Sequence, residues 1–258
     1  MDQPVVSVLM PAFNAEKYIA KAIESVLQQS FSNFELYIAF LDSDDLAWPN
    51  RLRDQVEFLS TSGVDICGGA YDSFYEARNK TKSSKQRYTD ADIRALITIS
   101  SPLCNPAVMG KAEVFKRHPY GPDKDYAEDY SLWAELALAG YRFANLKQKL
   151  ITYRIHDRQT SQVENAKTNT IFAKSREHYL LGLGISSELT PRAMGFFDRL
   201  KYAIPFLMQL NQKIPGITIG ANYEIYARFQ YRGNGVLTPF VRLERFFISA
   251  LASIKGAL

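Results

Sequence analysis

The sequence contains little cysteine, little net charge and no long apolar run, and each shortage excludes a class of protein. The two cysteines, Cys67 and Cys104, are too few for a disulfide framework and lack the spacing of a metal motif. They fit a reducing compartment, as small buried apolar side chains. The net charge of +4 is too weak to indicate a nucleic-acid partner. We therefore expect neither a disulfide scaffold nor a nucleic-acid-binding protein.

Apolar residues never run long enough to suggest a leader or a membrane span. The first run, Val5 to Met10, is too short for a signal-peptide core and has no basic residue before it. No stretch reaches about 18 uncharged apolar residues, which is the length that a spanning helix needs. These features predict a cytoplasmic protein, in which any membrane contact is peripheral, on the inner face of the cell membrane.

The charge is divided unevenly along the 258 residues, which are enough for one large domain and an extension. Residues 1–159 hold 19 Lys and Arg against 21 Asp and Glu, a net charge of −2. Residues 160–258 hold 12 against 6, a net charge of +6. The residue pattern also changes after Ser161, to helical segments broken by Gly and Pro. We predict a domain over residues 1–160 and a helical C-terminal extension over residues 161–258.

Strand-like and helix-like patterns alternate along the first part of the chain. Residues 15–29 carry apolar side chains on one helical face, with Asn14 as a candidate N-cap. Leu46–Leu59 is a second predicted helix, with Pro49 in its first turn. The other predicted elements are strands at Val5–Met10, Phe34–Leu41, Val64–Tyr71, 105–109, Arg142–Leu146 and Leu150–Arg154, helices at Thr89–Ile99 and Ala127–Ala139, and a mobile loop over 76–88. This alternation predicts an α/β fold with a largely parallel sheet.

Two loops follow strands at the edge of the sheet where α/β proteins bind ligands. One is Pro11 to Asn14, and the other begins with the acidic run Asp42-Ser43-Asp44-Asp45. An Asp-x-Asp arrangement suits a hard divalent cation, Mg²⁺ or Mn²⁺, which could hold a diphosphate. Alternatively, Asp42 caps the following helix and the other carboxylates are solvated.

Three further residues have both a functional and a structural interpretation. Glu128 and Asp129 open a helix, where acidic residues complement the helix dipole, but one of them could act as a general base. His156 follows a strand-like segment and is either a surface residue or a metal ligand that shares an acidic partner with the cation. From spacing alone these alternatives stay open.

Four segments, taken together and in order, resemble the family 2 glycosyltransferases, which have the GT-A fold. VSVLMPAFNAEKYIAKAIESVLQQSFSNFEL looks like their N-terminal signature, and YIAFLDSDDLAWPNRL resembles their metal-binding segment. AEDYSLWAELALAGYRF is similar to the helix that carries their catalytic base, and ITYRIHDRQTSQ to the segment that closes the domain. The resemblance covers about residues 5–162 and leaves about 95 C-terminal residues uncovered.

The resemblance implies a hexosyltransferase reaction and a set of site residues. It implies inverting transfer of a sugar from a nucleotide donor, a UDP-sugar, to a saccharide or lipid-linked acceptor in surface polysaccharide or glycolipid synthesis. Asp129 would be the base, with Glu128 nearby. The metal, Mn²⁺ or Mg²⁺, would be held by Asp44, with contacts from Asp42 and His156. The residues implied for the nucleotide pocket are Pro11, Ala12, Phe13, Asn14, Glu16, Asp42 and Asp44.

One part of the family pattern is absent between Leu36 and Tyr37. In the family, a base-reading Asp-Asp-Gly-Ser-like turn, a helix and a further strand separate the two segments that meet here. A unit of roughly 30 residues or more is missing, so we expect fewer strands and an incomplete wall on the uracil side. Three explanations are open: an internal segment omitted from the sequence, a real deletion that impairs activity, or a real deletion that another element compensates. The impaired case would leave a binding or scaffold protein without donor-base recognition.

The C-terminal region combines apolar and basic residues in two stretches, 191–210 and 236–258. Such stretches can lie on an anionic membrane surface. Alternatively, they pack against the first domain or form a dimer interface. The excess charge of +6 keeps a peripheral membrane contact as a prediction.

Overall fold

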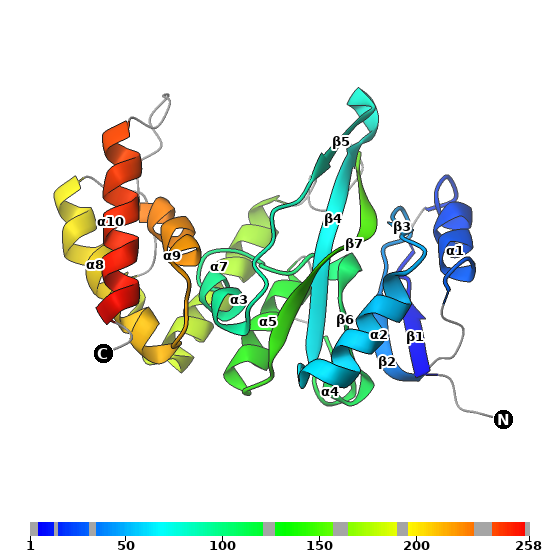
Figure 1. Cartoon of the computed structure of the whole chain (residues 1–258), viewed down its shortest axis with the longest axis horizontal. Helices are drawn as coiled ribbons and strands as arrows, with labels where there is room; N and C mark the ends of the chain where they lie inside the picture. Colours follow the sequence, from blue (N-terminus) through cyan, green and yellow to red (C-terminus); the bar gives the residue numbers. More distant parts are fainter. Residues whose placement is uncertain are drawn as a thin grey trace.

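The computed structural model describes residues 5–12, 15–30, 35–120, 127–156, 165–189, 196–229 and 239–255. Within these residues, seven strands form one sheet in the order β1-β2-β6-β4-β7-β3, with β5 paired to β4 (Figure 1). The strands are β1 Val5–Leu9, β2 Glu35–Phe40, β3 Leu46–Ala47, β4 Ile66–Tyr75, β5 Lys80–Ser83, β6 Met109–Lys111 and β7 Phe143–Ile155. The α/β assignment is confirmed. The sheet is mixed rather than largely parallel, because β6 runs antiparallel to both of its neighbours.

The first two strands form a parallel pair at one edge of the sheet. Helix α1, Ile19–Leu27, makes the crossover between β1 and β2, as a parallel connection requires. Strand β2 runs without a break through the Leu36–Tyr37 join and pairs with β1 on one side and β6 on the other. Since β1 ends the strand order, the sheet has no strand beyond it in the described residues. This agrees with the expected shortage of strands.

Strands β4 and β7 form the longest pair and run parallel across the middle of the sheet. Their register shifts on both sides of Ala70, where β7 accommodates three more residues than β4. The two short strands predicted over Arg142–Leu146 and Leu150–Arg154 are therefore one strand, Phe143–Ile155, interrupted by an irregularity. Strand β7 carries its carboxyl end, and with it His156, to the same end of the sheet as the Asp42 turn.

Helices cover both faces of the sheet. Helix α2, Arg51–Ser62, buries Leu52 and Leu59 against β1, β2 and β7 on one face. Helix α5, Glu128–Leu138, buries Trp133 and Leu136 on the other face, beside α4, Ala112–Arg117. Layers of helix, sheet and helix exclude water from the strands and hold their carboxyl ends in fixed positions.

The C-terminal helices form a second hydrophobic core at one end of the molecule. Helix α7, Asn165–Gly182, packs on α5, where Phe172 stacks on Tyr130 with ring centroids 3.8 Å apart. Helices α8 (Phe196–Lys213), α9 (Ile219–Tyr226) and α10 (Pro239–Lys255) bury apolar side chains against one another and against α3, Asp90–Leu96. Figure 1 shows these three helices at the end of the molecule opposite α1. The division into residues 1–160 and 161–258 stays a prediction.

Several boundaries differ from the predictions for local reasons. Helix α1 begins at Ile19, because residues 15–18 form a turn in which the Tyr18 and Ile19 amides donate to the Ala15 carbonyl; Asn14 lies outside the described residues. Helix α2 begins at Arg51, after the short strand β3, so Pro49 precedes it.

The segment predicted as a mobile loop is ordered. Residues 76–78 form a short 3₁₀ turn and β5 pairs antiparallel with β4, with Asn79 in the left-handed region at φ 47°. The side chains of β5 are exposed, so it buries nothing that a hydrophobic pattern could reveal. Thr89, at the start of the predicted helix Thr89–Ile99, is the N-cap of α3, and its side chain accepts the Asp92 amide at 3.2 Å.

Candidate functional site

The acidic run forms a tight turn directly after β2. The Asp45 amide donates to the Asp42 carbonyl at 3.1 Å, which folds the chain back on itself. One carboxylate oxygen from each of Asp42, Asp44 and Asp45 lies within 4.8 Å of the others. Asp42 is not a helix cap, since α2 starts at Arg51 and Asn50 is its N-cap. The capping interpretation of Asp42 is therefore wrong.

The end of β7 holds this turn in place. The Arg154 amide donates to Asp45 Oδ1 at 2.7 Å, and Arg154 Nε donates to the Asp44 carbonyl at 2.9 Å. His156 Nε2 lies 2.9 Å from Asp44 Oδ2. Two segments more than 100 residues apart in the sequence thus meet at Asp44, and His156 has the acidic partner that its interpretation as a ligand requires.

Burial and mutual repulsion make the acidic turn electrostatically strained. Burial raises the pKa of Asp42 to about 7, helped by the charges of Asp44, Asp129 and Glu128. Burial also raises the pKa of Asp45, with Asp42 and Asp44 adding to the rise. A bound cation would stabilise carboxylates that lie this close together, because its positive charge offsets their mutual repulsion.

The donor set fits a divalent cation. Oxygen atoms of Asp42 and Asp44 lie together beside a histidine nitrogen, and these are ligands that Mg²⁺ and Mn²⁺ accept. Asp45 Oδ2 is buried and has no hydrogen-bond partner. An orphaned buried carboxylate oxygen is costly unless a proton or a cation balances it. The orphaned atom is an observation about this turn that is independent of the sequence motif.

A buried arginine lies beneath the turn. Arg51 is 1% exposed, and its Nη2 donates to the Phe40 carbonyl at 2.6 Å while its Nε donates to Gln55 Oε1 at 3.0 Å. Burial lowers the pKa of Arg51 to about 10, against the charges of Asp45 and Asp42. The sequence analysis did not identify Arg51, because its pattern is that of an ordinary surface position in a helix.

An aromatic ring from the start of α1 supports His156. The Tyr18 ring stacks on His156 with centroids 5.3 Å apart, and the Arg154 guanidinium lies 4.8 Å from the Tyr18 centroid. The Tyr18 hydroxyl donates to Glu76 Oε2 at 2.8 Å, and Lys17 pairs with the same carboxylate. The β4–β5 hairpin, the α1 turn and the end of β7 are thereby linked. Tyr18 was predicted only as a residue of the apolar helix face.

Glu128 and Asp129 occupy the first turn of α5, as predicted, and both are partly buried. Asp129 Oδ1 accepts the Tyr130 amide at 2.7 Å. Burial nevertheless raises the pKa of Asp129 to about 6, and Glu128 adds to the rise. Both charges contribute to the raised pKa of Asp42, so the start of α5 lies near the acidic turn. A carboxylate with a pKa near neutrality is suited to accept a proton.

The loop after β1 lies only partly within the described residues. Pro11, Ala12 and Glu16 are exposed, whereas Phe13 and Asn14 lie outside the described residues. The Leu41 amide donates to the Leu9 carbonyl at 3.0 Å, so β1 ends beside the strand that leads to Asp42. The structure thus brings Asp42 close to Asp44 and His156 into contact with Asp44, places Glu128 and Asp129 near enough for their charges to act on Asp42, and leaves Pro11 and Ala12 after the adjoining strand end.

Comparison with known proteins points to one family. The family model described as "Glycosyl transferase family 2" matches residues 7–39. An uncharacterized glycosyltransferase of Haemophilus influenzae is 25% identical, over 70% of this chain and 76% of the relative. The O-antigen biosynthesis glycosyltransferase WbnJ of Escherichia coli is 22% identical, over 61% of this chain and 82% of the relative. The crystal structure of S. aureus TarS 1-349 has a TM-score of 0.51 at 14% identity, covering 100% of this chain and 89% of that one, which confirms the GT-A fold.

The same comparison bears on the join after Leu36. The alignment with the Haemophilus relative runs over 247 residues, but 70% of this chain is only about 181 residues. About 66 aligned positions therefore have no residue in this chain. The family-model match also ends at residue 39, three residues beyond Leu36–Tyr37. Both observations agree with an internal segment that relatives have and this chain lacks.

Proposed function

Because this chain belongs to the family 2 glycosyltransferases, we propose that it is a metal-dependent, inverting transferase that takes a sugar from a UDP-sugar. The observation that carries this proposal is the contact of the Asp42–Asp45 turn with His156, which lies 2.9 Å from Asp44, together with an acidic start of α5 whose charges contribute to the raised pKa of Asp42. The proposed transfer needs both parts of this arrangement. A cation must bind the diphosphate of the donor, and a carboxylate must lie near the sugar that is transferred.

The proposed roles follow from the position and ionisation of each side chain. Asp129 accepts the proton of an acceptor hydroxyl, whose oxygen then attacks the anomeric carbon of the donor. The bond from that carbon to the diphosphate breaks, and the nucleoside diphosphate leaves with the electron pair. Attack on one face and departure from the other invert the anomeric configuration. Burial, with a smaller contribution from the charge of Glu128, raises the pKa of Asp129 to about 6, which suits proton transfer near neutrality.

Asp42, Asp44 and His156 would hold Mn²⁺ or Mg²⁺. When bound, the cation supplies positive charge to the leaving diphosphate. Arg154 fixes the turn through Asp44 and Asp45, and Tyr18 keeps the His156 ring in place. Pro11, Ala12, Phe13, Asn14 and Glu16 are proposed to line the nucleotide side, because the strand that leads into this loop, β1, ends beside β2.

The acceptor is proposed to be a saccharide or a lipid-linked saccharide of a surface polysaccharide or glycolipid. The relative WbnJ is named for O-antigen biosynthesis, which supports a polysaccharide role. The enzyme would act in the cytoplasm, at the inner face of the cell membrane where a lipid-linked acceptor is exposed. Pocket shape, rather than fold, selects the sugar.

Calorimetric binding of UDP to the 258-residue chain, with and without Mn²⁺, tests the donor site. Metal-dependent binding is expected, because the acidic turn and His156 are assembled despite the missing segment. The edge position of β1 favours the alternative, a protein of this fold that has lost donor-base recognition. A folded protein that binds no UDP with Mn²⁺ would establish that alternative, and the gene should then be resequenced across Leu36–Tyr37.

A further inference from the structure

Helix α10 exposes a stripe of large apolar side chains at one end of the molecule. Leu243, Phe246, Phe247 and Leu251 are 52–56% exposed. Their spacing of three and four residues puts them on one side of the helix. Scattered single apolar residues are ordinary on a surface, but four large ones on one helical stripe form a patch.

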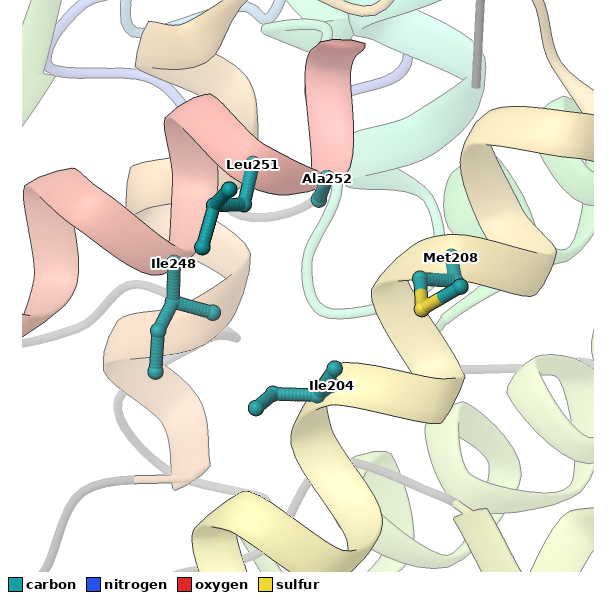
Figure 2. A pocket seen from close by; sticks show the side chains of 5 residues that line it. All are labelled: Ile204, Met208, Ile248, Leu251 and Ala252. Atoms are coloured by element: carbon teal, nitrogen blue, oxygen red, sulfur yellow. The ribbon is translucent and has the colours of Figure 1, made fainter. Parts of the chain in front are cut away.

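The patch continues into a groove between α8 and α10. Figure 2 shows Ile204 and Met208 of α8 facing Ile248, Leu251 and Ala252 of α10. The groove has a volume of about 100 Å³ and only hydrocarbon and thioether groups line it. Met208 is 38% exposed and Leu200, two turns earlier on α8, is 36% exposed. Two helices therefore contribute to one apolar surface, here called the α8–α10 face.

This face is additional to the side that packs the domain. Phe206, Leu207 and Leu210 of α8 are fully buried in the C-terminal core, and Ile248 and Ala252 of α10 belong to the same core. The fold of these helices is thus explained without Phe246, Phe247, Leu243 or Leu251.

The charge around the face favours an anionic partner. Residues 160–258 carry a net charge of +6, and Lys201 of α8 is exposed. Lys201 is three residues before Ile204 and seven before Met208, so it lies on the side of α8 that forms the groove. The acidic residue of α10 is engaged inside the protein, since Glu244 accepts the Tyr226 hydroxyl at 2.5 Å. A second copy of this basic region would face like charge.

We propose that the α8–α10 face docks on the surface of an anionic membrane. Phe246, Phe247, Leu243 and Leu251 enter the headgroup and acyl boundary, and the groove receives part of an acyl chain. Lysines and arginines of the region meet anionic headgroups, as in other amphipathic helices that lie in the interface. Among the described residues, none of the helices has the length and hydropathy to cross a bilayer, so the contact is peripheral. The proposal concerns binding alone and does not rest on the proposed donor or reaction.

Flotation of the full chain with liposomes tests the proposal. The protein is expected to float with phosphatidylcholine–phosphatidylglycerol vesicles and to remain behind with phosphatidylcholine alone. Phe246→Gln with Phe247→Gln should lower the bound-to-free ratio at least about tenfold. Lys201→Glu should lower binding to the anionic vesicles, and so should added salt, because screening weakens this attraction. Leu27→Gln, on α1 at the other end and 80% exposed, is the matched control and should float like the unmodified chain.

Two outcomes would overturn the proposal. One is a folded chain, as judged by its circular dichroism and thermal transition, that stays with the soluble fraction on anionic vesicles. The other is a double variant, Phe246→Gln with Phe247→Gln, that floats like the unmodified protein. A dimer in analytical ultracentrifugation that the Phe variants dissociate, without any flotation, would assign the face to a second copy instead. UDP binding by the Phe double variant is measured as well. Because flotation tests the membrane proposal and UDP binding tests the proposed function, the two can fail separately.

Discussion

The acidic site and the α8–α10 face differ both in the side chains they present and in the structure that holds those side chains. At the site, carboxylates are buried or partly buried, and the end of β7 holds two of them, Asp45 through the Arg154 amide and Asp44 through His156. At the face, apolar side chains are exposed and lie on two helices. The site exists only when the sheet is complete around β2 and β7, whereas the face needs little more than two packed helices.

The contrast indicates where each region is vulnerable. Removing one group at the site leaves other buried polar groups without a partner, which costs far more than losing a contact. A polar substitution for one of the half-exposed apolar side chains of the face lies outside the C-terminal core and should leave the fold intact. Changes at the site should therefore affect chemistry or stability, and changes at the face should affect only surface binding.

The largest effect is expected from Asp129→Asn. Transfer should fall by at least about 100-fold, because no carboxylate remains to accept the proton. UDP binding with Mn²⁺ and liposome flotation should stay nearly unchanged. The measurement is transfer of a labelled sugar, compared with Glu113→Gln, whose side chain is 64% exposed on α4. Full turnover in Asp129→Asn would show that another group is the base.

Asp44→Ala should weaken metal-dependent UDP binding by about 10–100-fold or more, since its carboxylate joins the turn to His156. Calorimetric titrations with and without Mn²⁺ measure this loss. Asp54→Ala is the matched control, because that carboxylate is on α2 and contacts the neighbouring Arg53. Equal UDP affinities in the two variants would remove Asp44 from the metal site.

Arg51→Met should destabilise the fold by about 3 kcal/mol, because the carbonyl of Phe40 and Gln55 Oε1 lose their buried donor. Arg53→Met, on the same helix and with its side chain 51% exposed, should change the free energy of unfolding by less than about 0.5 kcal/mol. Urea unfolding of both variants gives the comparison. Similar values for the two would mean that Arg51 has no special part in supporting the turn.

The smallest effect is expected in the stability of Asp129→Asn, which should gain stability in a pH-dependent way. The pKa of Asp129 is about 6 in the folded protein against an ordinary 3.8, so the folded state holds the proton more tightly than the unfolded state. The associated stability is present below about pH 4 and is lost as pH rises through about 6. Without metal, Asp129→Asn should therefore raise the melting temperature at pH 8 by about 2–4 °C.

At pH 4 this variant and the unmodified protein should melt at nearly the same temperature. Asn can still accept the Tyr130 amide, which keeps the comparison clean. The α8–α10 variants Phe246→Gln and Phe247→Gln should show no such pH dependence, because neither substitution changes a titrating group. A gain at pH 8 that persists at pH 4 would mean that burial of the charge is not its cause.

Local patterns predicted many of the elements and singled out the acidic run at the end of its strand, whereas the roles of the site residues came from the family resemblance and stay predictions. Strand β2 and helix α5 lie within the ranges predicted for them, Phe34–Leu41 and Ala127–Ala139. The hairpin over Lys80–Ser83 was missed because its exposed polar side chains carry no apolar period. The start of α1 was missed because the turn at Ala15–Tyr18 leaves the apolar period intact.

The sequence by itself determined which residue types are available: a carboxylate run after an apolar strand, an acidic helix start, a histidine after β7 and a basic C-terminal region. Tertiary structure alone decided that His156 meets Asp44, that Tyr18 and Arg154 support them, and that Arg51 is buried beneath Asp45. It also decided which apolar residues of α8 and α10 remain exposed. The reason is that periodicity reports neighbours along one element, whereas these contacts join segments as far as 112 residues apart, which only the packed sheet brings together.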